Sequence, residues 1–97
     1  MPTYITLGNW TDQGVRTVKD AGKRIDAAKQ MIKGAGGEMK AFYMTMGAYD
    51  LVTIVDAPDD EAVAKLLLTI GGLGNVRTTT LRAFSEAETR KIIGSLG

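Results

Sequence analysis

Hydrophobic and polar residues alternate along the first segment of the chain, Thr3 to Asn9, which predicts a β-strand. Its two faces are distinct, with Ile5 and Leu7 on one and Tyr4 and Thr6 on the other. Further runs rich in β-branched and aromatic residues predict strands at 38–46, 50–57 and 76–84. A short segment containing Gly47 separates the second strand from the third, so these two strands should form an antiparallel hairpin.

Apolar residues at intervals of three and four predict helices between these strands. Thr11 is the N-cap of the first, which runs to about residue 33 with a kink near Ala21-Gly22. Its buried stripe comprises Val15, Val18, Gly22, Ile25, Ala28 or Lys29, and Ile32. Pro58 opens the second helix, whose buried stripe comprises Ala62, Val63, Leu66, Leu67 and Ile70. Ser85 and Glu88 form a capping box for a last helix.

The order of these elements is strand, helix, strand, strand, helix, strand and a terminal helix. This is the β-α-β-β-α-β pattern of a ferredoxin-like α+β fold, with a four-stranded antiparallel sheet and both main helices on one face. No linker or low-complexity segment divides the chain. Residues 1–97 are therefore expected to form a single domain.

Because two helices cover only one face of a sheet, the other face is expected to meet a partner. We expect Ile5, Leu7, Val52 and Ile54 to face the helices, which leaves the open face to Tyr4, Thr6, Leu51, Thr53 and Val55. A face of threonines, tyrosine and aliphatic side chains is too apolar for full hydration. The interpretation is self-association as a homodimer or higher oligomer, and the alternative is a monomer with a wetted β-surface.

Composition narrows the functional classes. The net charge of +1 gives no overall attraction to nucleic acids or anionic membranes, so neither is expected as a partner. Cysteine and histidine are absent, which excludes disulfides, thiolate nucleophiles and the commonest metal ligands. We therefore expect neither a metal site nor a cofactor. The N-terminal residues lack a signal-peptide pattern, and a cytoplasmic location is the expectation.

Four separated motifs resemble the GYD-domain family of small bacterial proteins. They are Asn9-Trp10-Thr11-Asp12-Gln13-Gly14, Thr45-Met46-Gly47-Ala48-Tyr49-Asp50-Leu51-Val52, Ala57-Pro58-Asp59-Asp60 and Val76-Arg77-Thr78-Thr79-Thr80-Leu81-Arg82-Ala83. The Gly-Tyr-Asp signature itself carries one inserted residue, Ala48, between Gly47 and Tyr49. The resemblance covers nearly the whole chain and implies a ferredoxin-like fold related to dimeric α/β-barrel proteins. It implies no established reaction, so no catalytic residue is carried over.

Six residues are candidates for ligand binding: Trp10, Tyr43, Tyr49, Asp50, Arg77 and Arg82. Aspartate is disfavoured in strands, so the Asp50 carboxylate is expected to bond turn amides or to meet a cation. The functional alternative is that Tyr49 and Asp50 lie at the mouth of a pocket between paired sheets, with Asp50 as a general base. Trp10 is either a stacking surface for a ligand or a plug over the end of the core.

These observations favour a homo-oligomeric module that binds a small ligand or has a structural role, using the open face of the sheet. A small cofactor-independent enzyme of the monooxygenase or isomerase type is the alternative, by analogy of fold alone. A regulatory domain that senses a metabolite is compatible with the same residues. Whether the protein is an enzyme stays open at this point.

Overall fold

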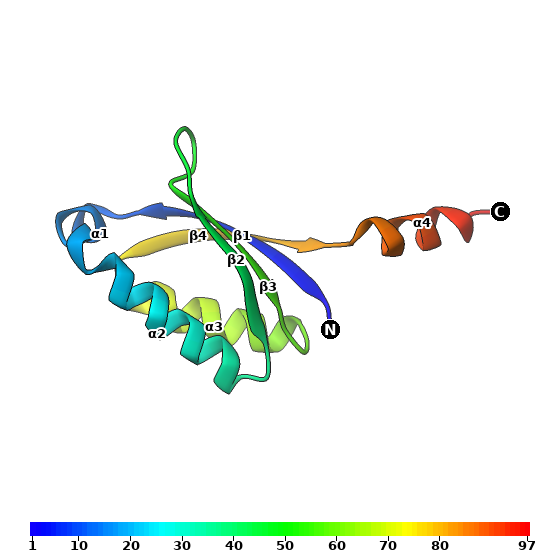
Figure 1. Cartoon of the computed structure of the whole chain (residues 1–97), viewed down its shortest axis with the longest axis horizontal. Coiled ribbons are helices and arrows are strands. Elements are labelled where there is room, and N and C mark those ends of the chain that lie inside the picture. The colour runs from blue at the N-terminus through cyan, green and yellow to red at the C-terminus, as the bar shows by residue number, and fades with distance from the viewer.

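The computed structural model describes residues 1–97 and contains one sheet flanked by helices. The elements are β1 (Thr3–Trp10), α1 (Asp12–Arg16), the 3-10 turn η1 (Val18–Asp20), α2 (Ala21–Gly34), β2 (Glu38–Met44), β3 (Leu51–Asp56), α3 (Asp60–Gly72), β4 (Val76–Ala83) and α4 (Glu86–Gly94). The four strands lie in the order β2-β3-β1-β4, and every neighbouring pair is antiparallel. The predicted ferredoxin-like α+β fold is confirmed. Helices α2 and α3 lie against one face of the sheet, and α4 extends away from the body (Figure 1).

The first predicted helix is divided, and the division lies at residues 17–20 rather than at Ala21-Gly22. Helix α1 is held against the loop before β4, where a Cβ atom on Gly14 would lie only 2.0 Å from the carbonyl oxygen of Asn75. Since α1 follows this loop instead of the axis of α2, Val15 and Val18 are exposed, and their predicted burial is wrong. Gly22 is exposed as well, whereas Ile25, Ala28 and Ile32 face the sheet as predicted.

The predicted assignment of the two sheet faces is wrong. The residues that share a face with the helices are Tyr4, Thr6, Gly8, Leu51, Thr53 and Val55, and the open face carries Ile5, Leu7, Val52, Ile54 and Leu81. Both sets alternate with period two, so strand periodicity alone does not say which set is inside. The open face is the more aliphatic of the two, and the rule that places the more apolar face in the core fails here.

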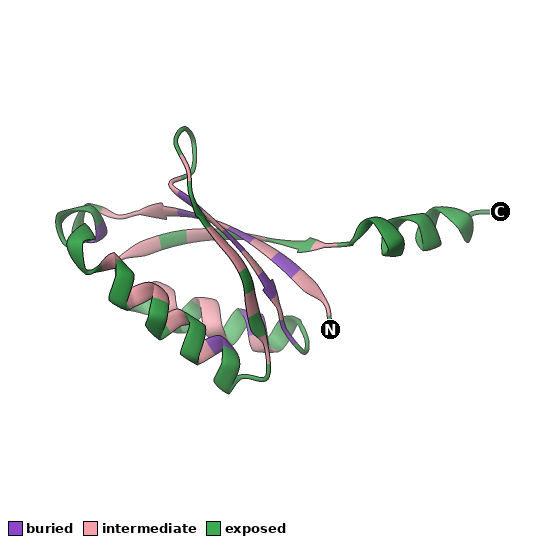
Figure 2. Ribbon diagram, viewed as in Figure 1, coloured by how far each residue is buried: buried purple, intermediate pink, exposed green.

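The buried core is small and lies at one end of the space between sheet and helices. It consists of Tyr4, Ile32, Val55, Ala57 and Val63, and only 10 of the 97 residues in the chain are buried (Figure 2). Val63 and its neighbours Leu66, Leu67 and Ile70 confirm the predicted stripe of α3. None of the helices is both long and apolar enough to cross a membrane.

A side-chain hydrogen bond fixes the start of α3 to the centre of the sheet. The hydroxyl group of Tyr4, which is buried in β1, donates to Oδ1 of Asp60, the first residue of α3. The Asp60 carboxylate, followed by burial of the ring, raises the pKa of Tyr4 above its ordinary value. The folded state therefore favours the neutral phenol.

The loop between β2 and β3 is bonded to the end of β1. Gly47 has a φ of 115°, a backbone conformation that glycine adopts without steric cost. The amide of Trp10 donates to Oδ2 of Asp50 at 3.0 Å, and the amide of Asp50 donates to the carbonyl oxygen of Gly8 at 2.9 Å. The Asp50 carboxylate thus accepts from an amide of β1, and not from the amides of its own turn that the sequence suggested.

Replacing Tyr4 with phenylalanine is expected to lower the free energy of unfolding by about 1 kcal/mol, the usual net value of one hydrogen bond. The raised pKa sets the sign of the pH dependence. The Tyr4 contribution is complete below a pH of about 10, the ordinary tyrosine value, and is lost as pH rises through the higher folded-state pKa. Urea unfolding between neutral and alkaline pH measures both effects. Tyr49→Phe is the control, and an equal effect in both variants contradicts the role given to Tyr4.

Replacing Asp50 with asparagine is expected to lower the melting temperature, because a neutral amide oxygen accepts the Trp10 amide proton less strongly than a carboxylate does. A loss of about 1 kcal/mol corresponds to a fall of roughly 4–8 °C in a domain of this size. Asp26→Asn, on the exposed side of α2, is the control for the loss of one negative charge. Calorimetry measures the melting temperature of both variants. An unchanged melting temperature for Asp50→Asn contradicts a stabilising role for the hydrogen bond between Trp10 and Asp50.

Candidate functional site

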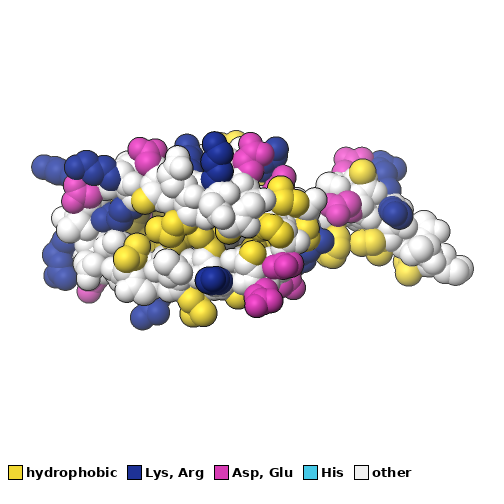
Figure 3. Space-filling view, turned by 90° about the horizontal axis from the view of Figure 1, so that it is seen from below, with side chains coloured by type: hydrophobic (Ala, Val, Ile, Leu, Met, Phe, Trp, Pro, Cys, Tyr) yellow, Lys and Arg dark blue, Asp and Glu magenta, His cyan; other side chains and the backbone are white.

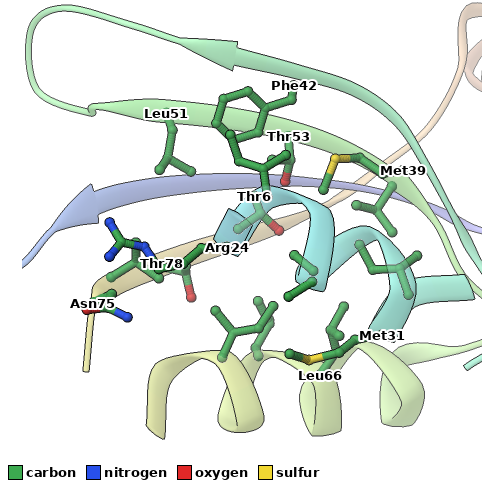
Figure 4. A pocket seen from close by; sticks show the side chains of 18 of the residues that line it. Thr6, Arg24, Met31, Met39, Phe42, Leu51, Thr53, Leu66, Asn75 and Thr78 are labelled. Carbon is green, nitrogen blue, oxygen red and sulfur yellow. The ribbon is translucent and has the colours of Figure 1, made fainter. Parts of the chain in front are cut away.

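An apolar cavity separates the sheet from α2 and α3. Its volume is about 290 Å³, and 16 of its 21 lining residues are hydrophobic, so its walls favour an apolar occupant. Figure 3 shows hydrophobic side chains along a hollow in the helix-bearing side of the molecule. In Figure 4, Thr6, Thr53 and Leu51 point from the sheet towards Met31 and Leu66 on the helices. The lining residues are Thr6, Trp10, Ala21, Arg24, Ile25, Ala27, Ala28, Met31, Ile32, Met39, Phe42, Leu51, Thr53, Val55, Leu66, Leu67, Ile70, Leu73, Asn75, Val76 and Thr78.

Short side chains on both layers leave this space unfilled. The sheet contributes Thr6, Thr53 and Thr78 at its floor, and α2 contributes alanines such as Ala21 and Ala28. Protein interiors normally pack to a density of about 0.74 with few voids. Larger side chains such as Met31 and Leu66 also line the space without closing it, and the buried core lies at the Tyr4 end.

The cavity offers hydrogen-bonding groups but little free charge. Arg24 is its one charged lining residue, and the chain already binds that guanidinium. Nη1 donates to the carbonyl oxygen and the Oγ1 atom of Thr17 at 3.2 and 2.9 Å, and Nη2 donates to the carbonyl oxygen of Gly14 at 3.2 Å. The hydroxyl groups of Thr53 and Thr78 remain as polar points on an apolar wall, whereas Oδ1 of Asn75 accepts a hydrogen bond from Nε2 of Gln13 at 3.0 Å. The arrangement suits a neutral molecule better than an anion.

Three of the six sequence candidates lie at the loop end of the sheet. Trp10 lines the cavity, and its backbone amide is bonded to Asp50. Tyr49 precedes Asp50 in the β2–β3 loop, and its carbonyl oxygen accepts a hydrogen bond from Oγ1 of Thr45 at 2.6 Å. The structure therefore brings Trp10 and Asp50 together, through a backbone contact.

The other three candidates are dispersed. Tyr43 on β2 and Arg77 on β4 share the open face, but they belong to the two opposite edge strands. Arg82 lies on the helix side at the far end of β4, with its guanidinium carbon 5.8 Å from the ring centre of Tyr4 and 4.6 Å from that of Phe84. The structure does not bring the two arginines into contact with Tyr49 or Asp50.

Sequence reasoning missed the cavity, because it assigned its helical wall to a filled core. Ile25, Ala28, Leu66, Leu67 and Ile70 all belong to the stripes predicted to be buried. The signal in the sequence is the pairing of threonines on the helix-facing side of the strands with alanines on α2. No group of three or more Asp and Glu side chains is placed to hold a metal ion.

The amino-acid sequence of this chain matches a known domain family and a characterised relative. The GYD domain matches residues 4–93. The "Glutamine synthetase and cystathionine beta-lyase binding protein" of Thermus thermophilus is 36% identical over 89 residues, which are 91% of this chain and 94% of that protein.

Solved structures share the fold. The crystal structure of TTHA0845 from Thermus thermophilus is similar with a TM-score of 0.56 and 29% identity, over 88% of this chain and 95% of that one. The crystal structure of FFRP-DM1 has a TM-score of 0.59 at 22% identity, over 87% of this chain and all of that one, and shows likeness of fold alone. With the domain match spanning nearly the whole sequence, the chain belongs to the GYD-domain family.

Proposed function

We propose that this protein is a homo-oligomeric binding module that holds a small neutral molecule between its sheet and helices. The cavity of about 290 Å³ carries the proposal. Its volume is close to the lower end of the range for small-molecule pockets, roughly 300–1,000 Å³. Its apolar walls with a few convergent polar groups are typical of such pockets.

The energetic cost of leaving this space empty supports an occupant. The space opens at the hollow seen in Figure 3, so water reaches its apolar walls in the chain without a ligand, and contact of apolar surface with water is unfavourable. Apolar walls hold water poorly, so an apolar molecule stabilises the folded chain more than solvent does.

The lining restricts the chemistry of the ligand. Leu51, Ile70 and Phe42 contribute aliphatic and aromatic surface, and Thr53 and Thr78 offer hydroxyl groups on one wall. A neutral ring or short hydrocarbon with one hydroxyl or carbonyl group matches both the apolar surface and the hydroxyl groups. A carboxylate or phosphate would meet only Arg24, which already uses three of its five N–H groups on Thr17 and Gly14.

Self-association follows from the opposite face of the same sheet. Ile5, Leu7, Val52 and Ile54 form its centre, and Leu81 on β4 is 49% exposed. A contiguous aliphatic patch of this kind on a domain with so few buried residues marks an interface. A second copy, presenting the same face, covers it with the symmetry usual in homodimers.

The name of the Thermus relative raises a second function, binding to other proteins. The exposed α4 favours it, because this helix carries apolar side chains that no part of its own chain covers. The enzyme alternative receives no comparable support from the cavity. No carboxylate, lysine or tyrosine lines it, so a general acid or base would have to come from outside its walls.

A neutral fluorescent probe such as N-phenyl-1-naphthylamine tests the cavity. We expect the probe to bind and to accept energy from Trp10, the only tryptophan, which lines the same space. Ala28→Phe fills the cavity and should weaken binding about tenfold or more, which corresponds to ~1.4 kcal/mol. Ala64→Phe, on the exposed side of α3, is the matched control. Equal affinity in both variants excludes the cavity as the site.

Light scattering tests the pairing. We expect a native mass of at least twice 10.4 kDa. Ile54→Lys places a charge at the centre of the open face and should yield single subunits, because an unpaired charge within an interface costs several kcal/mol. Leu68→Lys, on the exposed side of α3, is the control and should keep the native mass. A native protein of 10.4 kDa at high concentration rules out the proposed assembly.

A further inference from the structure

Helix α4 has an unpartnered apolar stripe. Thr89, Ile92, Ile93 and Leu96 recur at intervals of three and four, so they lie on one side of the helix and of the turn that follows it. Glu86 and Arg90, whose side chains pair at 2.9 Å, border this stripe on the side of Ile93, and Lys91 lies on the opposite side of the helix. All residues from Phe84 to Gly97 are exposed, and Ile93 is 60% exposed. We call residues 86–97 the C-terminal arm.

The arm needs a partner to be stable as a helix. Isolated helices shorter than about 12–15 residues are marginal in water, and most helices in proteins are stabilised by packing of an apolar face. The capping box of Ser85 and Glu88 supports only the first turn. The arm also makes the chain extended, with a radius of gyration of 14.6 Å, whereas a domain of about 100 residues has roughly 13 Å. The covering surface is therefore expected on another molecule.

A second unpartnered apolar feature lies at the opposite end of the sheet. The end of β4, from which the arm leaves, pairs with Thr3, whereas the β2–β3 hairpin closes beside Gly8. The hairpin rises on the side of the sheet away from α2 and α3 (Figure 1). We call residues 43–49 the hairpin tip. Tyr43 is 60% and Met46 is 96% exposed, so the tip presents large apolar side chains on the side where a second copy would lie.

From these two features we infer that the arm of one copy packs against the hairpin tip of a second copy. The inference rests on the proposed pairing through the open face. Suppose that two sheets meet face to face and that the strands of one run antiparallel to those of the other. The arm end of each sheet then lies over the hairpin end of the other sheet. A two-fold axis then forms both contacts at once, and each copy gives one arm and receives one.

The area of the open face supports this additional contact. With strands about 4.8 Å apart and about 3.3 Å per residue, four strands of about seven residues give a face on the order of 450 Å² in projection. A standard protein interface buries about 800 Å² of accessible surface per partner, a quantity that follows the relief of the side chains and so exceeds the projected area of the same contact. An apolar stripe such as Ile92, Ile93 and Leu96 set against Tyr43 and Met46 adds apolar surface to that of the sheets. The second copy is therefore the occupant that the geometry favours.

Cross-linking tests the contact directly, because the chain has no cysteine of its own. Met46→Cys protein is mixed with Ile93→Cys protein, allowed to exchange, and treated with a short bismaleimide. A linked species of twice 10.4 kDa from the mixture, and not from either variant alone, is the expected result. Links between two copies of Ile93→Cys alone mean that the arms meet each other, which overturns the inference.

Two substitutions on α4 provide the energetic test. Ile93→Gln should raise the dissociation constant of the pair about tenfold or more. Lys91→Gln, on the charged side of α4, should leave it unchanged. A wild-type mass of 10.4 kDa removes both the pairing and the arm contact. The arm contact alone is overturned if the mass is twice that value but the mixture gives no cross-link and Ile93→Gln has no effect. The arm would then be free to bind a different protein.

Discussion

The whole architecture depends on the fact that a β-sheet has two faces, and that two helices cover one of them. Strands β1 and β3 carry apolar side chains on both sides, with Tyr4 and Val55 towards the helices and Ile5 and Ile54 away from them. A strand of this type is stable only when both of its faces are shielded from water. The helices supply one shield from within the chain. In the proposed assembly, a second copy supplies the other.

The same constraint explains why the cavity is tolerated. The helix-facing side of the sheet is lined in part by threonines, so α2 and α3 pack closely only near Tyr4 and leave space towards Trp10. A chain of 97 residues has little hydrophobic surface to spare, and an unfilled space lowers its stability further. The proposed ligand and the proposed pairing of two copies would therefore act in the same direction, because each would add buried apolar surface to the folded state.

Local chemistry made much of the fold predictable from sequence. The capping box of Ser85 and Glu88, the positive φ of Gly47 and the spacing of Val63, Leu66 and Ile70 are each fixed by residues close together in the chain. The two faces of the sheet could not be assigned in this way. The choice between Tyr4 and Ile5 as the inward residue depends on which side the crossover helices occupy, and both sides alternate equally well.

The candidate site was less predictable, for a related reason. A cavity is a property of the distance between layers, and the stripe of Ile25 and Leu67 reads the same whether the space opposite is full or empty. The hydrogen-bond partner of Asp50 could not be predicted for the same reason. Its carboxylate bonds an amide of β1, forty residues away in sequence, and only the sheet brings the two together.

The distribution of side chains across the central strands suggests a division of roles. Towards the helices β1 presents Thr6, whose hydroxyl group is bonded to that of Thr80 at 2.9 Å, and β3 presents Thr53, whose hydroxyl group can orient a ligand. Towards the open side they present Leu7 and Ile54, which contribute packing and no polar recognition. A sheet that places its aliphatic residues at the surface and its hydroxyl groups inside reverses the usual order. That reversal is advantageous if the surface is an interface and the interior is a binding site, since stability then comes from the pair and specificity from the space within each copy.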